Sequence, residues 1–213
     1  RQEGKDIGID WGLTSLAATS EGQLLGLSLY PWLKDRDQEL LELTRSLQRQ
    51  GIKPRSSRRY RALNRRISQY VKNEVGRVLN RLASHDIKSI TCEDLDFRGQ
   101  GLSRRTRVIV SRAGRSAFKQ KLADLTENHG IEVHSINPAY TSQQCSGCGL
   151  STSENRKGSS FQCVHCGKTL HADVNAARNI IGRRSAPSNG FQYWSKESIL
   201  DYLNQELSLI HIS

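Results

Sequence analysis

The feature that most constrains this chain is a pair of Cys-x-x-Cys motifs separated by 14 residues. Cys145 and Cys148 form the first motif, and Cys163 and Cys166 form the second. Each pair can wrap a metal ion through a tight turn, and four thiolates suit Zn²⁺ in a closed tetrahedral shell that leaves no position for catalysis. Two disulfides in a secreted domain are the alternative, but nothing in the sequence suggests secretion. We therefore expect a structural zinc ribbon.

Positive charge is concentrated in one stretch of the sequence. The 213 residues carry a formal net charge of +11, and the stretch from Lys53 to Lys119 contains 18 basic and 5 acidic residues. A solvated face would explain a moderate excess, but this density favours a polyanionic partner and therefore nucleic acid. No apolar run reaches the roughly 20 residues of a membrane-spanning helix, and no secretory signal opens the chain. We expect a cytoplasmic protein, associated with the nucleoid when bound to DNA, with no membrane partner.

Both ends of the sequence indicate a fragment. The chain begins at Arg1 and contains no methionine. Residues 207–213 match one reading frame of a transposase adaptor used in sequencing libraries, so we interpret them as a sequencing artefact. We therefore expect the protein to continue beyond both ends, and we exclude these seven residues from the functional argument.

Hydrophobic periodicity predicts a fold that alternates strands and helices. An arginine-rich loop is expected over residues 98–107, just before a helix that ends at His129 and Gly130. The order of elements predicts an α/β fold, with a mixed sheet flanked by helices. The predicted strands are 5–10, 13–19, 22–29, 88–93 and 131–136, and the other predicted helices are 35–50, 58–84, 173–181 and 196–207.

Three acidic residues, Asp10, Glu93 and Asp173, each stand at the end or the start of a predicted element. This arrangement lets residues far apart in sequence converge at one edge of a sheet. Clustered carboxylates can hold two Mg²⁺ or Mn²⁺ ions about 4 Å apart, the arrangement that hydrolyses phosphodiesters. Two alternatives remain open: Asp173 can be a plain helix N-cap, and Asp94 rivals Glu93 because neighbouring strand residues face opposite sides.

Four parts of the sequence carry distinctive motifs: residues 8–12 with 16–20, 90–95, 137–149 and 172–180. They resemble motifs of a known family, the transposon-encoded TnpB (OrfB) proteins. The resemblance covers about residues 5–183 in the family's order, and the segments at the ribbon and beyond it are highly specific. The family's amino-terminal region is absent, and Ala172 precedes Asp173 where many members have arginine. The matching segments are 8–12 with 16–20 for the first RuvC motif, 90–95 for the second, 137–149 for the entry into the zinc ribbon and 172–180 for the third motif.

The resemblance implies an RNase H-like (RuvC-type) fold with an inserted zinc ribbon, and RNA-guided cleavage of DNA, as in the related small type V CRISPR effectors. Its partners would be a DNA substrate and a guide RNA. Asp10, Glu93 and Asp173 match the family's catalytic acids, which bind two Mg²⁺ or Mn²⁺ ions, and the four cysteines match its zinc ligands. Nucleic-acid contacts are expected from Arg55, Arg58, Arg59, Arg61, Arg65, Arg66, Arg104, Arg105 and Arg107.

The resemblance also predicts how the chain is divided. Residues 1–140 would form the nuclease core, 141–170 the ribbon, 171–184 the helix of the third motif and 185–213 a C-terminal tail. The leading hypothesis is therefore the catalytic module of an RNA-guided DNA endonuclease. The alternatives are a guided DNA-binding repressor without nuclease activity, against which the complete set of acids argues, and an unguided RuvC-type resolvase or transposase, against which the ribbon argues.

Overall fold

A computed structural model describes residues 3–93 and 101–210, with side chains described as far as residue 205. Asp94, the start of the expected loop at residues 98–100 and the last residues of the tail (211–213) lie outside this part. The described residues contain a five-stranded sheet in the order β3-β2-β1-β4-β5. Strands β1, β4 and β5 are parallel, and β2 is antiparallel to both of its neighbours. The strands are β1 (Lys5–Trp11), β2 (Ala17–Thr19), β3 (Leu24–Leu25), β4 (Ile87–Cys92) and β5 (Glu132–Ser135).

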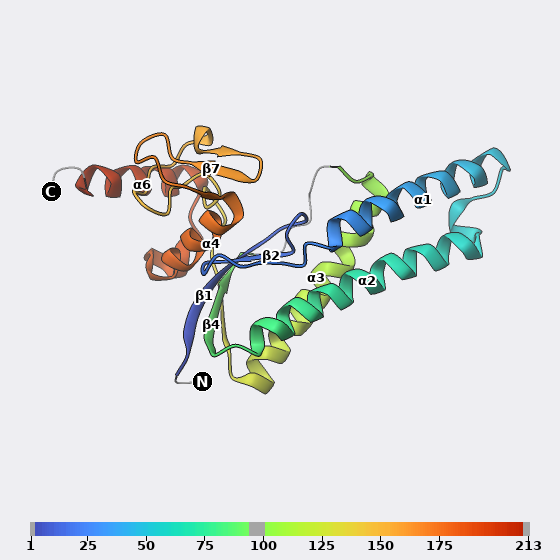
Figure 1. The fold of residues 1–213 in the computed structure, drawn as a ribbon, viewed down its shortest axis with the longest axis horizontal. Helices are drawn as coiled ribbons and strands as arrows, with labels where there is room; N and C mark the ends of the chain where they lie inside the picture. Colours follow the sequence, from blue (N-terminus) through green and yellow to red (C-terminus); the bar gives the residue numbers. More distant parts are fainter. Residues whose placement is uncertain (1–2, 94–100, 211–213) are drawn as a thin grey trace.

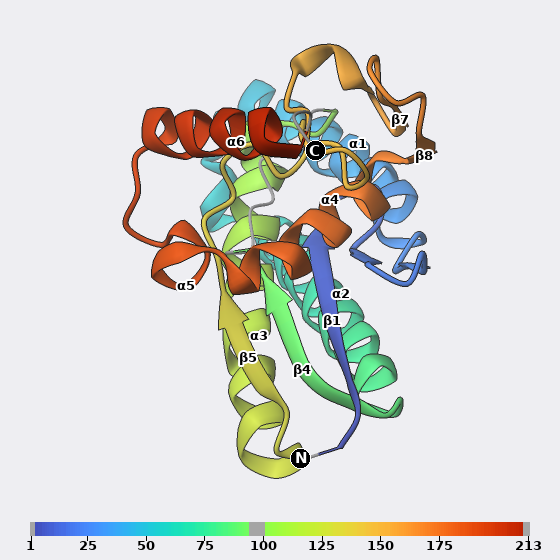
Figure 2. The same ribbon diagram turned by 90° about the vertical axis from the view of Figure 1, so that its left-hand side faces the viewer.

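Helices cover both faces of this sheet, and the expected mixed α/β fold is confirmed. Figure 2 shows α4 and α5 in front of the strands and α2 and α3 behind them, and Figure 1 shows α1 and α2 extending away from the sheet as a hairpin. No helix in residues 3–93 and 101–210 is long and apolar enough to cross a membrane. The helices are α1 (Leu29–Arg49), α2 (Arg58–Ala83), α3 (Arg104–His129), α4 (Ala172–Gly182), α5 (Pro187–Phe191) and α6 (Lys196–Ile210), with short 3-10 turns at Pro54–Ser56, Ser153–Asn155 and Arg183–Ser185.

The main hydrophobic core lies between the sheet and helices α1 to α3. Alternate residues of β1, namely Ile7, Ile9 and Trp11, point into this core, as do Ile90 and Cys92 of β4. Side chains alternate between the two faces of a strand, so the residues between them point to the opposite face, where α4 packs.

Local signals explain where the two long helices begin and end. The side chain of Ser57 caps α2, and that of Ser103 caps α3, by accepting hydrogen bonds from backbone N–H groups of the first turn. Helix α3 ends at Gly130, whose left-handed conformation (φ 63°) suits glycine. Because its N-cap is Ser103, α3 includes Arg104, Arg105 and Arg107, so the prediction that these arginines lie in a loop is wrong.

The predicted boundaries near the amino terminus also need correction. The strands expected at 13–19 and 22–29 are short, and α1 begins at Leu29 instead of residue 35. Burial of Leu29 and Leu33 in the core favours the longer helix. Pro31 is tolerated because it stands in the first turn, where its missing N–H would have no helical partner.

A second, three-stranded sheet follows β5. It contains β6 (Arg156–Lys157), β7 (Ser160–Gln162) and β8 (Thr169–His171), all antiparallel. Phe161 is fully buried at its centre, against Cys145 and Cys163. The ribbon therefore has a small apolar core of its own, which the sequence did not predict.

Candidate metal sites and a basic groove

The four cysteines form a compact cluster. Among the residues that the structure describes, they are the one group of three or more histidines, cysteines or acids placed to share a metal ion, and their ligand atoms all lie within 4.8 Å of one another. The Sγ atoms of Cys145 and Cys166 are 3.7 Å apart, and those of Cys148 and Cys163 are 3.6 Å apart. A tetrahedral zinc site with Zn–S bonds of about 2.3 Å has sulfur–sulfur separations of about 3.8 Å. The cluster therefore fits zinc and not a disulfide pair.

Electrostatics in the cluster also favour a cation. Burial raises the pKa of Cys148 to about 12. For Cys163 burial acts in the same direction, but hydrogen bonds from the backbone of Cys166 and His165, and from the side chains of Cys148 and Cys166, outweigh it and lower the pKa to about 7. A divalent ion stabilises thiolates, so it would offset the burial of Cys148.

The three predicted acids come from distant segments and meet on the α4 face of the main sheet. Ile9 of β1 and Cys92 of β4 are paired in register, and both point into the core. Asp10 and Glu93 are the residues that directly follow them. Both carboxylates therefore point away from the core and towards α4. Gly8 lets α4 approach on this face, because a Cβ atom at Gly8 would lie 2.1 Å from the carbonyl oxygen of Ala177.

Asp10 is a buried acid with a strongly raised pKa. Burial, together with the negative charges of Glu93 and Asp173, raises its pKa well above the ordinary value, while the Arg156 guanidinium acts in the opposite direction. Because the charges of Glu93 and Asp173 both act on Asp10, the structure brings the three carboxylates into one neighbourhood. Buried acids with a raised pKa, such as Asp10 and Glu93, are typical of functional sites.

Asp173 stands in the first turn of α4, but it is not the N-cap. His171 occupies that position and accepts a hydrogen bond from the backbone N–H of Asp173. The carboxylate of Asp173 instead accepts a hydrogen bond from Ser15 Oγ at 2.9 Å and pairs with Arg156 of the ribbon at 2.9 Å. The N-cap alternative for Asp173 is therefore wrong, and its side chain is free to face the other acids.

Glu93 is held by a neighbour from the segment between β5 and the ribbon. Thr141 Oγ1 donates a hydrogen bond to Glu93 Oε1 at 2.5 Å. Burial raises the pKa of Glu93, while the Thr141 hydrogen bond and the positive charge of Arg183 counteract this effect. Thr141, Arg183 and Arg156 were not predicted from the sequence, because nothing in their local patterns indicates which acid they will meet.

Carboxylate oxygens on a buried, polar face are the hard ligands that Mg²⁺ and Mn²⁺ prefer. The three acids do not form a cluster as compact as that of the cysteines. Two ions about 4 Å apart need a wider set of ligands than a single ion does. The donor set therefore fits divalent ions, with Arg156 neutralising part of its charge.

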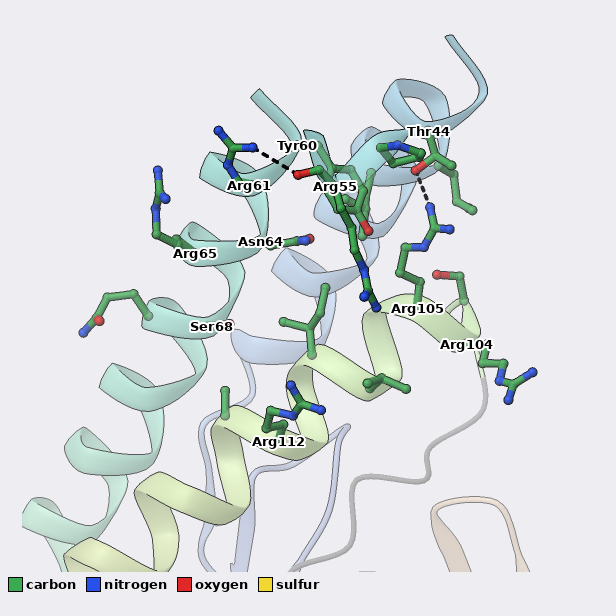
Figure 3. Close-up of a pocket in the computed structure, with 18 of the residues that line it drawn as sticks. Thr44, Arg55, Tyr60, Arg61, Asn64, Arg65, Ser68, Arg104, Arg105 and Arg112 are labelled. Atoms are coloured by element: carbon green, nitrogen blue, oxygen red, sulfur yellow. Dashed lines mark hydrogen bonds between the residues drawn. The ribbon is translucent and has the colours of Figure 1, made fainter. Parts of the chain in front are cut away.

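A third feature is a basic groove of about 1850 Å³ between α1, α2 and α3 (Figure 3). Arg55 and Arg61 are linked at its upper rim, where Arg61 donates to the Arg55 carbonyl oxygen at 3.1 Å. Arg105 donates to Thr44 Oγ1 at 2.7 Å. The residues that line the groove include no acid, and nine of them are cations: Arg45, Lys53, Arg55, Arg61, Arg65, Lys72, Arg104, Arg105 and Arg112.

The groove includes only some of the arginines predicted to contact nucleic acid. Five of the nine, Arg55, Arg61, Arg65, Arg104 and Arg105, line it, and all nine are exposed. The other four, Arg58, Arg59, Arg66 and Arg107, do not line it. The sequence missed Arg45, Lys53, Lys72 and Arg112, which join the groove only because three helices meet there.

The chain is similar to known proteins in both sequence and fold. Residues 116–180 match the family described as "Cas12f1-like, TNB domain". Over 64 residues the chain is 51% identical to the CRISPR-associated endodeoxyribonuclease Cas12f1 of Sulfoacidibacillus thermotolerans. This matched region covers 30% of this chain and 15% of that protein. Over 199 residues it is 28% identical to the putative RNA-guided DNA endonuclease InsQ of Escherichia coli (strain K12), with 82% of this chain and 48% of InsQ covered.

The predicted resemblance to the TnpB family is confirmed. The fold itself resembles that of Cas12f1 in a cryo-EM structure of the Cas12f1-sgRNA-target DNA complex. The TM-score is 0.56 at 20% identity, covering 85% of this chain and 49% of that one. The chain spans about half of InsQ and a much smaller part of the Sulfoacidibacillus relative.

Proposed function

We propose that this chain is the catalytic module of an RNA-guided DNA endonuclease, with an RNase H-like (RuvC-type) core. Its partners would be a DNA substrate and a guide RNA, and it would work in the cytoplasm, associated with the nucleoid when bound to DNA. The observation that carries the proposal is the meeting of Asp10, Glu93 and Asp173 on one face of the sheet. The strand order β3-β2-β1-β4-β5, with β2 antiparallel, supports the proposed core.

The three acids would hold two Mg²⁺ or Mn²⁺ ions, which supply a nucleophile and stabilise the leaving oxygen of a phosphodiester. The chain's own residues prepare this site. Burial of Asp10 excludes water and strengthens its interaction with any cation. Ser15 and Arg156 hold the Asp173 carboxylate from two sides. Arg156 also offers guanidinium donors beside the acids, where a phosphate oxygen would approach.

The basic groove would hold nucleic-acid backbone. Nine cations without an opposing carboxylate form a surface that attracts phosphates regardless of sequence. In guided nucleases base pairing reads the sequence and the protein holds the backbones. The zinc ribbon would have a structural role, because four thiolates complete the coordination shell.

One experiment tests both parts of the proposal. The purified chain is assayed for Mg²⁺-dependent nicking of single-stranded DNA and, separately, for DNA binding over a range of salt concentrations. Asp10→Asn should lower the nicking rate on the order of 10³-fold, because several kcal/mol of charge stabilisation depends on the metal ligands. It should leave DNA binding and zinc content unchanged. Asp86→Asn, at an exposed aspartate, is the matched control.

The DNA-binding measurement tests the groove through substitutions of its arginines. Neutralising Arg61 and Arg65 together should weaken binding and reduce the salt slope by roughly 0.7–0.9 for each phosphate that the protein no longer neutralises. The same change at Arg58 and Arg59, which are exposed on α2 but do not line the groove, should have less effect. Full nicking by Asp10→Asn would refute the acid site, and equal effects of the two arginine pairs would refute the groove.

A further inference from the structure

Helix α4 and the 3-10 turn that follows it carry a polar ladder, formed by Asn175 and Asn179 of the helix and Arg183, its C-cap. These residues are spaced four apart, so their side chains lie one above another along the helix. They are only 0%, 8% and 4% exposed, respectively. Buried polar groups need hydrogen-bond partners, so the ladder must bind another part of the protein.

The partner of the ladder is the backbone between β5 and the first cysteines. Asn175 Nδ2 donates to the carbonyl oxygen of Gln144 at 2.7 Å, and Asn179 Nδ2 donates to that of Thr141 at 2.8 Å. Arg183 donates to the carbonyl oxygen of Asn137 at 3.0 Å. The helix that contributes Asp173, together with the turn at its end, thus fixes the path of this segment from one end to the other.

The same segment reaches across to the second acid. Thr141 is 3% exposed, and its hydroxyl lies 2.5 Å from Glu93 Oε1 and 3.0 Å from the carbonyl oxygen of Pro138. A hydroxyl has a single proton to donate, and a carboxylate is the stronger acceptor. The proton of Thr141 is therefore directed to Glu93, which leaves the other carboxylate oxygen available to a cation.

We infer that Thr141 is a positioning residue for Glu93, and that the polar ladder sets its place relative to Asp173. This inference rests on the proposed metal site. Partners of this kind, which orient a metal ligand without touching the ion, typically change metal affinity by about 10–100-fold when removed. The arrangement ties Glu93 of the sheet and Asp173 of α4 to a common element, so that the two acids keep a fixed separation.

The test measures how tightly Mn²⁺ alone binds to the full 213-residue chain. The electron paramagnetic resonance signal of free Mn²⁺ reports how much of the ion is bound. Thr141→Val keeps the shape of the side chain and removes the hydroxyl, so it should weaken binding about 10-fold. Thr141→Ser keeps the hydroxyl and should restore most of the affinity. Zinc content and melting temperature report whether each variant is folded, and Thr141→Ala replaces Thr141→Val if the latter does not fold.

A double-mutant cycle separates positioning from a general structural effect. In a Glu93→Gln background the carboxylate is gone, so Thr141→Val should have little further effect on Mn²⁺ affinity. Wild-type affinity in a folded Thr141→Val variant would overturn the inference, as would an equal loss in Thr141→Ser. If Asp10→Asn binds Mn²⁺ as wild type does, the proposed metal site fails instead, and with it the basis of the inference.

Discussion

The two candidate metal sites of this protein are built in opposite ways. The cysteine cluster takes its ligands from two short motifs close together in the sequence, and its sulfur atoms already have the separations of a tetrahedral zinc site. The acid site takes its ligands from β1, the end of β4 and the start of α4. Its carboxylates repel one another, and the pKa of Asp10 is raised well above the ordinary value by burial and by the other two acids.

The difference shows how a stable site and a reactive site can share one chain. The cysteine cluster is closed, and a single ion would satisfy it and contribute folding energy. The acid site holds negative charge that the fold does not fully neutralise, and a site of this kind is available for reaction. Arg156 connects the two, since it belongs to the ribbon and pairs with Asp173.

The largest expected effect concerns the cysteine cluster. Cys163→Ser should abolish tight zinc binding, because structural zinc binding is worth roughly 10 kcal/mol or more. The ribbon should then become sensitive to proteases, while the main core, which includes no ribbon residue, stays folded. Zinc analysis and limited proteolysis measure the two effects. Cys92→Ala, at the buried cysteine of β4, should keep its zinc. Protease resistance without zinc would contradict the structural role of the ion.

The same contrast explains what could be predicted from the sequence. The cysteine spacing specifies its site locally, and the structure brings those four residues together. The three acids could be singled out because each stands at the end or start of an element. Arg156 could not, because its pairing with Asp173 depends on how the ribbon folds back over α4. The groove was predicted only in part, since its lining comes from three helices whose packing no local pattern specifies.

A second, smaller effect tests the long-range assembly of the acid site. Gly8→Ala should lower the stability of the fold by about 3 kcal/mol, because its Cβ atom would overlap the backbone of α4, which cannot shift alone. Thermal or urea unfolding measures the change. Gly76→Ala is the control: it meets nothing within 4 Å and lies inside α2, so it should raise stability by about 0.5–1 kcal/mol. Equal effects of the two substitutions would contradict close packing of α4 on β1.

Element boundaries show the same limit of local reasoning. The start of α1 was predicted six residues too late, because burial of Leu29 and Leu33 in the core, and not a capping signal, extends the helix. At α3 the N-cap Ser103 is a signal within the local sequence. Its hydroxyl, however, also donates a hydrogen bond to Asp37 of α1 at 2.5 Å. Tertiary contacts therefore select among starts that the sequence leaves open.

The smallest expected effect is a gain in stability, and it concerns Asp10, whose pKa is raised well above the ordinary value. Folding disfavours the ionised form of Asp10, so its carboxylate destabilises the protein increasingly as the pH rises from the unfolded pKa, near 4, towards the raised folded value. Asp10→Asn should therefore stabilise the fold by about 1 kcal/mol at pH 8 and by almost nothing below pH 4. Unfolding measured at both pH values, without divalent ions, checks the sign.

Without divalent ions at pH 8, we expect Asp10→Asn to be more stable than wild type. Adding Mn²⁺ should make wild type the more stable of the two. An ion that binds only the folded state stabilises it by mass action, and the asparagine variant lacks one of the ligands. Wild type should then gain stability with Mn²⁺ concentration while Asp10→Asn gains little. The cysteine cluster should show no such reversal, because four thiolates prefer zinc to the harder Mn²⁺ ion. If Mn²⁺ stabilised both proteins equally, Asp10 would not be a ligand, and the contrast between a satisfied site and a strained one would lose its basis.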